Sequence, residues 1–303
     1  MKKRIPQIKF ENLTWICIEN ASFEDIQKIE KKFKFHHLDL EDCLEENQRS
    51  KIDKYPDYNF IILHLPRFKG RGKKYISSLE LNIFVGEDYL ITLHDGNNRL
   101  NELFNLCKNN KEYRSEFMAE GSGYLLYNIL NDLFEKSFIL VDDLTRNLNN
   151  LEKEVFTVSS DKDMLKDILR LKKDIINFRR IIFPQRSLLA QLEHIKFSNL
   201  DSDLEIYFDN IVDKIEKIYS TLESLKELVE SVHQTNEAMM AQKTNNVIRV
   251  LTVFSVIMLP LTLISGIFGM NVNLPNQDFG SIIISMCFLL FLMLIFFKRK
   301  GWL

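Results

Sequence analysis

Two apolar stretches near the C-terminus decide the fold: Val247–Phe268 reads VIRVLTVFSVIMLPLTLISGIF, and Gly280–Phe297 reads GSIIISMCFLLFLMLIFF. As helices, the first would be roughly 33 Å long and the second roughly 27 Å. Both lengths are close to the roughly 30 Å hydrocarbon thickness of a bilayer. Apolar runs of this length are rare in soluble folds, so we predict two membrane-spanning helices rather than two buried core helices.

The rest of the chain has the opposite character. Of the 303 residues, the 51 from Val247 to Phe297 carry only two formal charges, Arg249 and Asp278. Residues 1–246 carry 36 basic and 41 acidic residues, a net charge of -5, and the mean hydropathy of -0.13 conceals this division. The composition excludes a disordered chain and a disulfide-stapled small domain. The acidic balance argues against nucleic acid as a partner.

Basic residues predict the orientation of the two spans. The segment between them, Asn271–Phe279, contains no lysine or arginine. The flanking basic residues are Lys243, Arg249, Lys298, Arg299 and Lys300. Basic residues favour the cytoplasmic side, so we expect both termini to be cytoplasmic and the charged N-terminal part to be cytosolic. No signal peptide is visible after Met1. We therefore expect a multi-pass protein of the plasma (inner) membrane.

Residues 1–118 predict a cytosolic α/β domain. Branched and aromatic residues indicate strands at Thr14–Glu19, Asn59–Leu65, Ser78–Val85 and Tyr89–His94. The turn residues Gly86-Glu87-Asp88 lie between the last two, which favours an antiparallel hairpin. Short helices are expected at Phe23–Phe33 and Leu38–Glu46.

Residues 119–200 predict a cytosolic helical region. Residues 124–183 contain no glycine or proline, and the pair Ser160 and Asp163 resembles a helix N-cap. We expect one helix to end near Thr157–Ser160 and a second to end at Pro184, because proline cannot donate the next backbone hydrogen bond. A further helix is expected over Ser187–Ile195.

Asp201–Leu259 predicts a long helix that continues into the first span. Its 59 residues include no glycine or proline, so as one helix it would be roughly 88 Å long. Apolar residues alternate by four and three at Ile211, Ile215, Ile218, Leu222, Leu225, Val229 and Val232. This spacing is typical of a coiled coil, and equally of an amphipathic helix that packs on its own domain.

Two spans cannot enclose a pore, so a channel would require a ring of subunits. The first span offers a stripe that is suited to lining one, with polar residues at its ends and branched apolar residues between them. The stripe comprises Asn245, Ile248, Leu251, Ser255, Leu259, Thr262 and Gly266. Ordinary packing between helices explains the same stripe.

Gly269-Met270-Asn271 follows the first span and precedes a short loop. It comes after Leu259-Pro260-Leu261-Thr262, and the chain ends in the basic tail Lys298-Arg299-Lys300. With His37-Leu38-Asp39-Leu40-Glu41-Asp42 in the N-terminal part, these motifs resemble those of the CorA-type metal ion (magnesium) transporter family. The resemblance covers nearly the whole chain.

The resemblance implies a homopentameric funnel that conducts Mg²⁺, in some members Co²⁺ or Ni²⁺, passively through a pore gated by stalk helices. Mg²⁺ is then the substrate and a candidate regulator, with no organic cofactor. The resemblance further implies a pore entrance formed by Gly269, Met270 and Asn271, with Asn271 as the first contact of the hydrated ion. Neutral amide oxygens suit this role, because Mg²⁺ releases its water reluctantly and conduction requires weak sites. Ile248 and Leu251 would form an apolar constriction that gates by dewetting.

The resemblance also implies a regulatory Mg²⁺ site, from which this sequence departs. Tyr207-Phe208-Asp209-Asn210 resembles a Y-F-x-D stretch of the family, but Asn210 takes the place of the acidic residue. Asp209 and Asp213 are the neighbouring candidates for a divalent cation.

These patterns divide the chain into six parts. They are a cytosolic α/β domain (1–118), a cytosolic helical region (119–200), a stalk helix continuing into the first span (201–268), an extracytoplasmic loop (269–279), the second span (280–297) and a basic cytosolic tail (298–303).

Two other functions stay open. One is a Zn²⁺ transporter of the same family, with or without proton coupling. The other is a membrane-anchored coiled-coil sensor that has no pore. We do not expect an enzyme, because the sequence has no nucleophile–base set, no glycine-rich phosphate loop and no paired-carboxylate signature.

Overall fold

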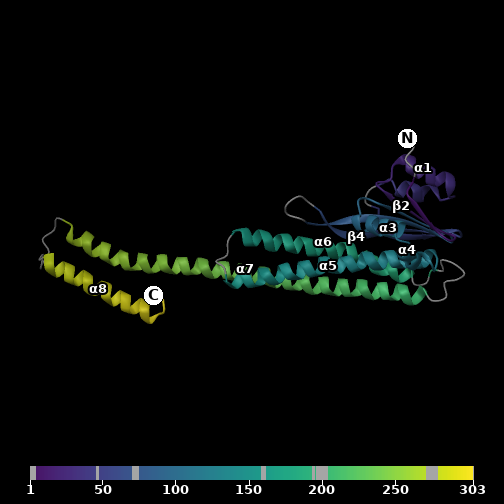
Figure 1. The fold of residues 1–303 in the computed structure, drawn as a ribbon. Helices are drawn as coiled ribbons and strands as arrows, with labels where there is room; N and C mark the ends of the chain where they lie inside the picture. The colour runs from purple at the N-terminus through teal and green to yellow at the C-terminus, as the bar shows by residue number, and fades with distance from the viewer. Residues whose placement is uncertain are drawn as a thin grey trace. The chain divides into compact units, whose positions relative to one another are not determined.

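A computed structural model describes residues 5–45, 48–69, 75–157, 162–192, 195, 204–270 and 279–302 of the chain. It divides into two compact units, Met1–Val232 and His233–Leu303 (Figure 1). The first unit contains an α/β domain and a helical bundle. The second contains the end of a long helix and one further helix.

A six-stranded sheet forms the centre of the first unit. Its strand order is β1-β2-β6-β5-β4-β3, and every pairing is antiparallel apart from that of β2 with β6. The four predicted strands and the predicted hairpin are confirmed, while the four-residue strands β1 and β3 were not predicted. The strands are β1 (Gln7–Phe10), β2 (Leu13–Glu19), β3 (Lys51–Lys54), β4 (Tyr58–Lys69), β5 (Tyr75–Gly86) and β6 (Tyr89–His94).

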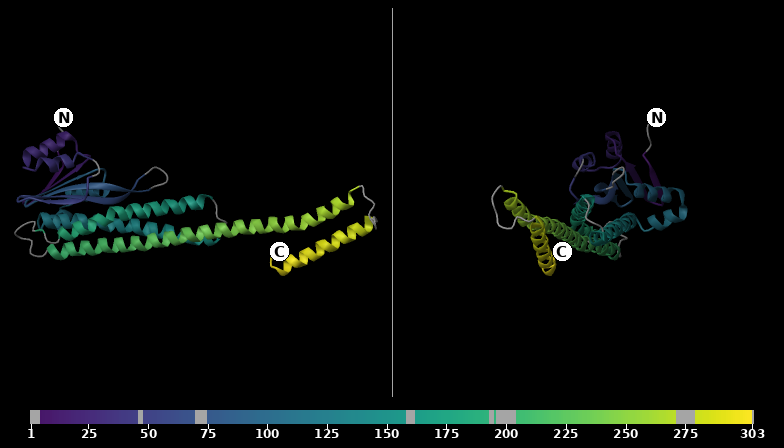
Figure 2. Two further views of the ribbon diagram at one scale, coloured as in Figure 1. Left: turned by 180° about the vertical axis from the view of Figure 1, so that it is seen from behind. Right: turned by 90° about the vertical axis from the view of Figure 1, so that its left-hand side faces the viewer.

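Helices cover both faces of the sheet, with α1 on one side and α5 and α6 on the other (Figures 1 and 2). Alternate residues of each strand point to opposite sides of the sheet. Because helices pack on each side, both sets of residues are buried. Phe60 and Ile62 join the core beside α1 and α2, whereas Ile61 and Leu63 join the core beside α5 and α6. The helices are α1 (Phe23–Lys32), α2 (His37–Asp42), α3 (Asn98–Asn109), α4 (Lys111–Met118), α5 (Ser122–Thr157) and α6 (Lys162–Leu192).

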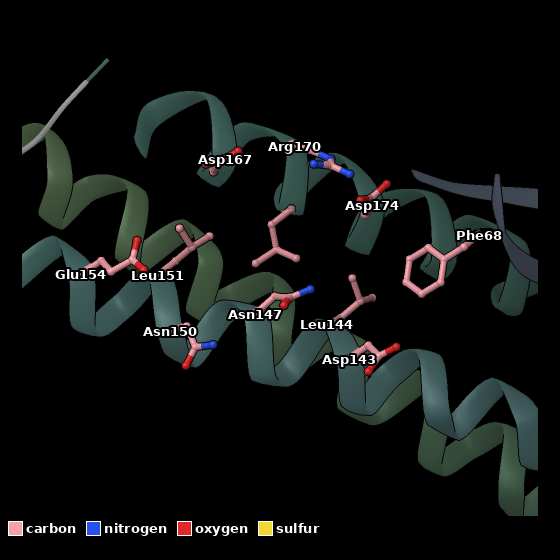
Figure 3. Close-up of a pocket in the computed structure, with 11 residues that line it drawn as sticks. Phe68, Asp143, Leu144, Asn147, Asn150, Leu151, Glu154, Asp167, Arg170 and Asp174 are labelled. Carbon is pink, nitrogen blue, oxygen red and sulfur yellow. The ribbon is translucent and has the colours of Figure 1, made fainter. Parts of the chain in front are cut away.

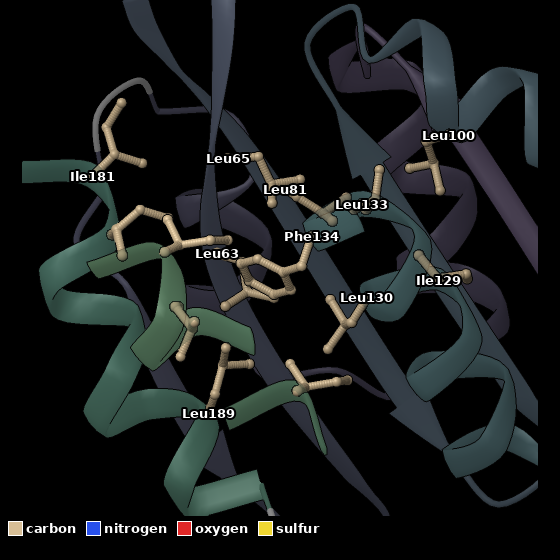
Figure 4. Close-up of a cluster of buried hydrophobic side chains, with 14 of the residues drawn as sticks. Leu63, Leu65, Leu81, Leu100, Ile129, Leu130, Leu133, Phe134, Ile181 and Leu189 are labelled. Atoms are coloured by element: carbon tan, nitrogen blue, oxygen red, sulfur yellow. The ribbon is translucent and has the colours of Figure 1, made fainter. Parts of the chain in front are cut away.

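The larger core lies between the sheet and the helical bundle. Phe134 of α5 lies against Leu63 of β4, and Leu130 and Leu189 lie near them from two different helices (Figure 4). Phe134 and Leu63 are completely buried. Burying a side chain of this size stabilises the fold by about 1.5–3 kcal/mol.

The prediction that a helix ends at Pro184 is wrong. Helix α6 continues through Pro184 to Leu192, so the separate helix expected over Ser187–Ile195 is the last part of α6. Proline removes one backbone hydrogen bond from a helix. The surrounding turns offset that loss by burial, since Ile182, Leu188 and Leu189 all lie in the core. The predicted end near Thr157 is confirmed.

Helix α7 (Leu204–Phe268) confirms the predicted long helix, although Asp201 lies outside the described residues. All seven apolar residues of the four-and-three spacing, from Ile211 to Val232, are at most 5% exposed within the single chain. The amphipathic alternative is therefore the correct one for this segment. Ion pairs with α6 support the packing: Arg186 binds Glu216 at 2.6 Å, and Arg179 binds Glu223.

A buried carboxylate in this unit has a predicted effect on stability. Asp174 of α6 accepts a hydrogen bond from the backbone N–H of Ile76 at 2.9 Å. Burial raises the pKa of Asp174 above its ordinary value, although this hydrogen bond and Arg170 oppose the shift. Because the folded state binds the proton more tightly, this group's contribution to stability falls as pH rises from about 4 through the raised pKa.

Asp174→Asn is therefore expected to reduce the loss of stability between acidic and neutral pH, since asparagine retains the acceptor oxygen for Ile76. Thermal unfolding midpoints measured across a pH series test this. Asp142→Asn is the matched control, because Asp142 is exposed on α5. Identical pH profiles for the wild type and Asp174→Asn would contradict the prediction.

Candidate cation pathway

The second unit consists of two helices that are long and apolar enough to cross a membrane. These are the end of α7 and α8 (Phe279–Arg299), which contain both predicted spans. Only 6% of the most apolar window of α7 is buried, and none of that of α8. They are therefore not core helices of this chain, because a core helix would be covered by other elements.

The predicted stripe on α7 lies on an exposed face. All seven of its residues are exposed in the single chain, with Leu251 and Leu259 at 60% and 70%. At about 100° per residue, five of the others lie within about 40° of Ser255 around the helix axis, and Asn245 lies about 80° away. An alanine side chain at Gly266 would meet no atom within 4 Å.

The opposite face of α7 is partly covered. Val253 is 5% exposed, and Ile257, Pro260 and Ile264 are half-buried. These four residues lie about 140–200° around the axis from Ser255. Helix α8 is the other described helix of this unit, and its Phe297 is also 5% exposed. The covered side of α7 therefore faces away from the stripe.

The polar residues of the stripe present hydrogen-bond acceptors. The hydroxyl of Thr262 donates to the carbonyl oxygen of Met258 at 2.9 Å, within the same helix. Its oxygen retains lone pairs, which can accept hydrogen bonds from the water shell of a cation. The stripe contains no carboxylate. Its surface is suited to a hydrated ion rather than to a tightly coordinated one.

The described part of α7 leads directly to the Gly-Met-Asn motif. The N–H of Gly269 donates to the carbonyl oxygen of Ser265 at 2.9 Å, and Met270 is 60% exposed. A side-chain carbon added at Gly269 would lie 3.0 Å from that same oxygen, so larger residues are disfavoured there. Asn271, the predicted first contact of the ion, lies outside the described residues.

Comparison with known families decides the identity. Residues 10–299 match the family model described as "CorA-like Mg2+ transporter protein". The chain belongs to this family. The match includes the sheet, the bundle and both apolar helices, so it extends well beyond the short Gly-Met-Asn motif.

Individual CorA-type proteins agree in sequence and in fold. The Cobalt/magnesium transport protein CorA of Thermotoga maritima is 25% identical over 96% of this chain and 83% of its own length. The protein of the same name from Methanocaldococcus jannaschii is 25% identical over 100% of this chain and 96% of its own. The solved structure of the CorA magnesium transporter from M. jannaschii superposes with a TM-score of 0.83, at 23% identity over 98% of this chain and 94% of that one. That likeness confirms the predicted fold class.

The two aspartates named for a regulatory site in this CorA-type chain are accessible, but they do not form a complete metal site. Asp209 and Asp213 are exposed and four residues apart, so they share one face of α7. Within the described residues, no three His, Cys, Asp or Glu side chains are close enough to hold a metal ion. Within the described residues Asp209 and Asp213 are therefore a pair without a third acidic, His or Cys side chain, and Asn210 beside them is exposed as well.

Acidic side chains also line a cavity of about 620 Å³ between α5 and α6 (Figure 3). Asp143 and Glu154 come from α5, and Asp167 and Asp174 come from α6. Arg170 lies among them, and the buried carboxylate of Asp174 accepts the N–H of Ile76. Four carboxylates and one arginine line the cavity, but among the residues that the structure describes, no three His, Cys, Asp or Glu side chains here are close enough to hold a metal ion.

Proposed function

We propose that this CorA-type chain is a channel-like transporter that conducts Mg²⁺, and also Co²⁺ or Ni²⁺, passively across the plasma membrane. The observation that carries the proposal is the exposed stripe on α7, which lies opposite the covered side of that helix and is followed by the Gly-Met-Asn motif. The family match over residues 10–299 supports the chemistry, and the relatives named above are cobalt and magnesium transport proteins.

A ring of copies is required, because the two apolar helices of one chain cannot enclose water. In a homopentamer, the stripe of each α7 would face the central axis and each α8 would face lipid. The small residues Ser255 and Gly266 would allow neighbouring α7 helices to approach closely. Both termini would be cytoplasmic, because Lys298 and Arg299 follow the second span and basic residues favour that side.

The stripe would present different kinds of side chain to the ion along its length. Asn271 and Thr262 offer neutral oxygens to the water shell of the ion, and Asn245 does so at the other end. Ile248 and Leu251 offer only apolar surface, so a narrow ring of them would exclude water. A small movement of α7 that widens this ring would admit water and the ion.

Regulation would act through α7, because one helix contains both the bundle residues around Leu222 and the stripe. Mg²⁺ bound at Asp209 and Asp213, with ligands from a second copy, would hold the bundles of neighbouring chains together. Protease protection that increases with Mg²⁺ concentration would support this site, and protection independent of Mg²⁺ would contradict it.

Ion uptake by purified protein in lipid vesicles tests the function. We expect Mg²⁺ to enter along its gradient, faster with an inside-negative potential, and we expect no dependence on a pH gradient. Empty vesicles control for leakage. Uptake of Zn²⁺ in preference to Mg²⁺, and only with a pH gradient, would instead identify a proton-coupled zinc transporter. No uptake of any divalent ion would favour the membrane-anchored sensor.

A further inference from the structure

A cavity in the first unit, remote in sequence from the pore stripe, has the features of an anion site. Its volume is about 590 Å³, within the range of small-molecule sites. The end of β4, the segment before α3 and one face of α5 form its walls. Its floor is apolar and includes Leu65 and Leu133, which lie close together in the core (Figure 4).

Three cations from distant parts of the chain line this cavity: Arg67 and Lys69 of β4, and Lys136 of α5. Lys69 and Lys136 are exposed, and neither forms an ion pair or a hydrogen bond with the residues that the structure describes. A fourth cation, Arg99, is already committed to Asp132 at 2.5 Å and to Glu102 at 3.0 Å. The cavity therefore carries two lysine charges that the described protein does not neutralise.

Arg67 supplies an unused donor in the same wall. Its Nη1 atom donates to the backbone oxygen of Asp95 at 2.7 Å, which fixes the guanidinium in place. Its Nε atom is buried and has no acceptor among the described residues. An unsatisfied buried donor is costly, and a ligand oxygen would satisfy it.

The start of α3 adds backbone donors. The first N–H groups of a helix have no partners within the helix, and they favour anions. The side chain of Asn97 binds the N–H of Leu100 at 3.1 Å, and Asn98 and Arg99 of the first turn line the cavity. Gly96, with φ of +71°, turns the chain into the helix, and a side-chain carbon there would lie 3.5 Å from Nη1 of Arg67. That distance is an ordinary contact, so it is the positive φ that favours glycine at this turn.

We propose that this cavity binds a nucleoside di- or triphosphate. The phosphates would lie among Arg67, Lys69, Lys136 and the start of α3, because arginine, lysine and helix N-termini are the usual partners of phosphate. The apolar floor at Leu65 and Leu133 would receive the base, which a simple inorganic anion lacks. The inference concerns binding only and does not depend on ion transport.

Calorimetric titration of the full-length chain in lipid nanodiscs tests this site. ATP, ADP and inorganic tripolyphosphate are titrated separately at one fixed free Mg²⁺ concentration, so that chelation of Mg²⁺ does not differ between them. We expect ATP to bind, and tripolyphosphate to bind at least about tenfold more weakly because it has no base. Equal affinity for ATP and tripolyphosphate would overturn the nucleotide assignment, and no binding of ATP would overturn the site.

Matched variants then locate the binding. The double variant Lys69→Gln and Lys136→Gln is expected to weaken ATP binding by at least about tenfold, since each lysine makes a charge-assisted contact. Both side chains are exposed, so the fold should be retained, and an unchanged unfolding midpoint without ligand verifies this. Lys111→Gln removes one exposed charge on α4 as a control. Unchanged affinity in the double variant, or equal weakening by Lys111→Gln, would overturn the proposal.

Discussion

Replacing Asn271 with alanine is expected to lower the rate of Mg²⁺ uptake into vesicles by at least about tenfold. The reason is the chemistry of the pore entrance: a hydrated Mg²⁺ ion must exchange hydrogen bonds with bulk water for hydrogen bonds with the protein. A hydrogen bond to a charged group contributes about 1.5–3 kcal/mol, and alanine offers no acceptor. In the proposed ring each copy contributes one Asn271, so one substitution removes every such contact.

The same substitution elsewhere in the loop separates this effect from a general disturbance. Asn276→Ala changes the same residue type five positions further along the chain and is expected to leave the uptake rate within about twofold, because the proposal gives Asn276 no contact with the ion. Both variants are compared at equal protein content by a fluorescent Mg²⁺ indicator inside the vesicles. If Asn271→Ala conducts as the wild type does, Asn271 is not the ion contact and the sensor without a pore gains support.

Leu222→Ala should have the largest effect on stability. Leu222 is completely buried at the centre of the apolar seam of α7, which is the set of seven buried residues with four-and-three spacing from Ile211 to Val232. Truncation removes buried apolar surface and leaves a cavity in the bundle, at a cost of about 2–5 kcal/mol. The midpoint of urea unfolding is measured by the fluorescence of Trp15, which is fully buried, in a chain whose Trp302 is replaced by phenylalanine.

The control for this prediction is one turn further along the helix. Glu227 is exposed on α7, so Glu227→Ala is expected to change the free energy of unfolding by less than about 0.5 kcal/mol. A seam that packed only between copies would behave differently, because Leu222→Ala would then alter the dependence of unfolding on protein concentration. An effect of Leu222→Ala that disappears on dilution would contradict packing within the chain.

Pro184 shows where local rules fail. A proline normally marks the end of a helix, and the sequence around it predicts two helices rather than one. The lost hydrogen bond is local, whereas the gain at Ile182 and Leu189 depends on a sheet whose last strand ends at His94, 88 residues before Ile182. Only the assembled core determines whether the lost hydrogen bond or the gained burial has the larger effect on stability.

For a related reason, the four-and-three spacing in α7 cannot distinguish packing between chains from packing within one chain. The same pattern serves a coiled coil between chains and an amphipathic helix within one chain, because both require one apolar face. The positions of α5 and α6 decide between them by burying Ile211 to Val232 inside the chain. The stripe from Asn245 to Gly266 is the converse case, since the chain leaves its residues exposed.

The sequence by itself determined the two spans, the strands of the hairpin, the long helix and the family, because each rests on a run or spacing of neighbouring residues. The tertiary structure alone decided which face of α7 is covered, and how Arg67, Lys69 and Lys136 come to line one cavity. The physical reason is distance along the chain. Local periodicity fixes which side of a helix or strand is apolar, but only packing fixes what lies against it.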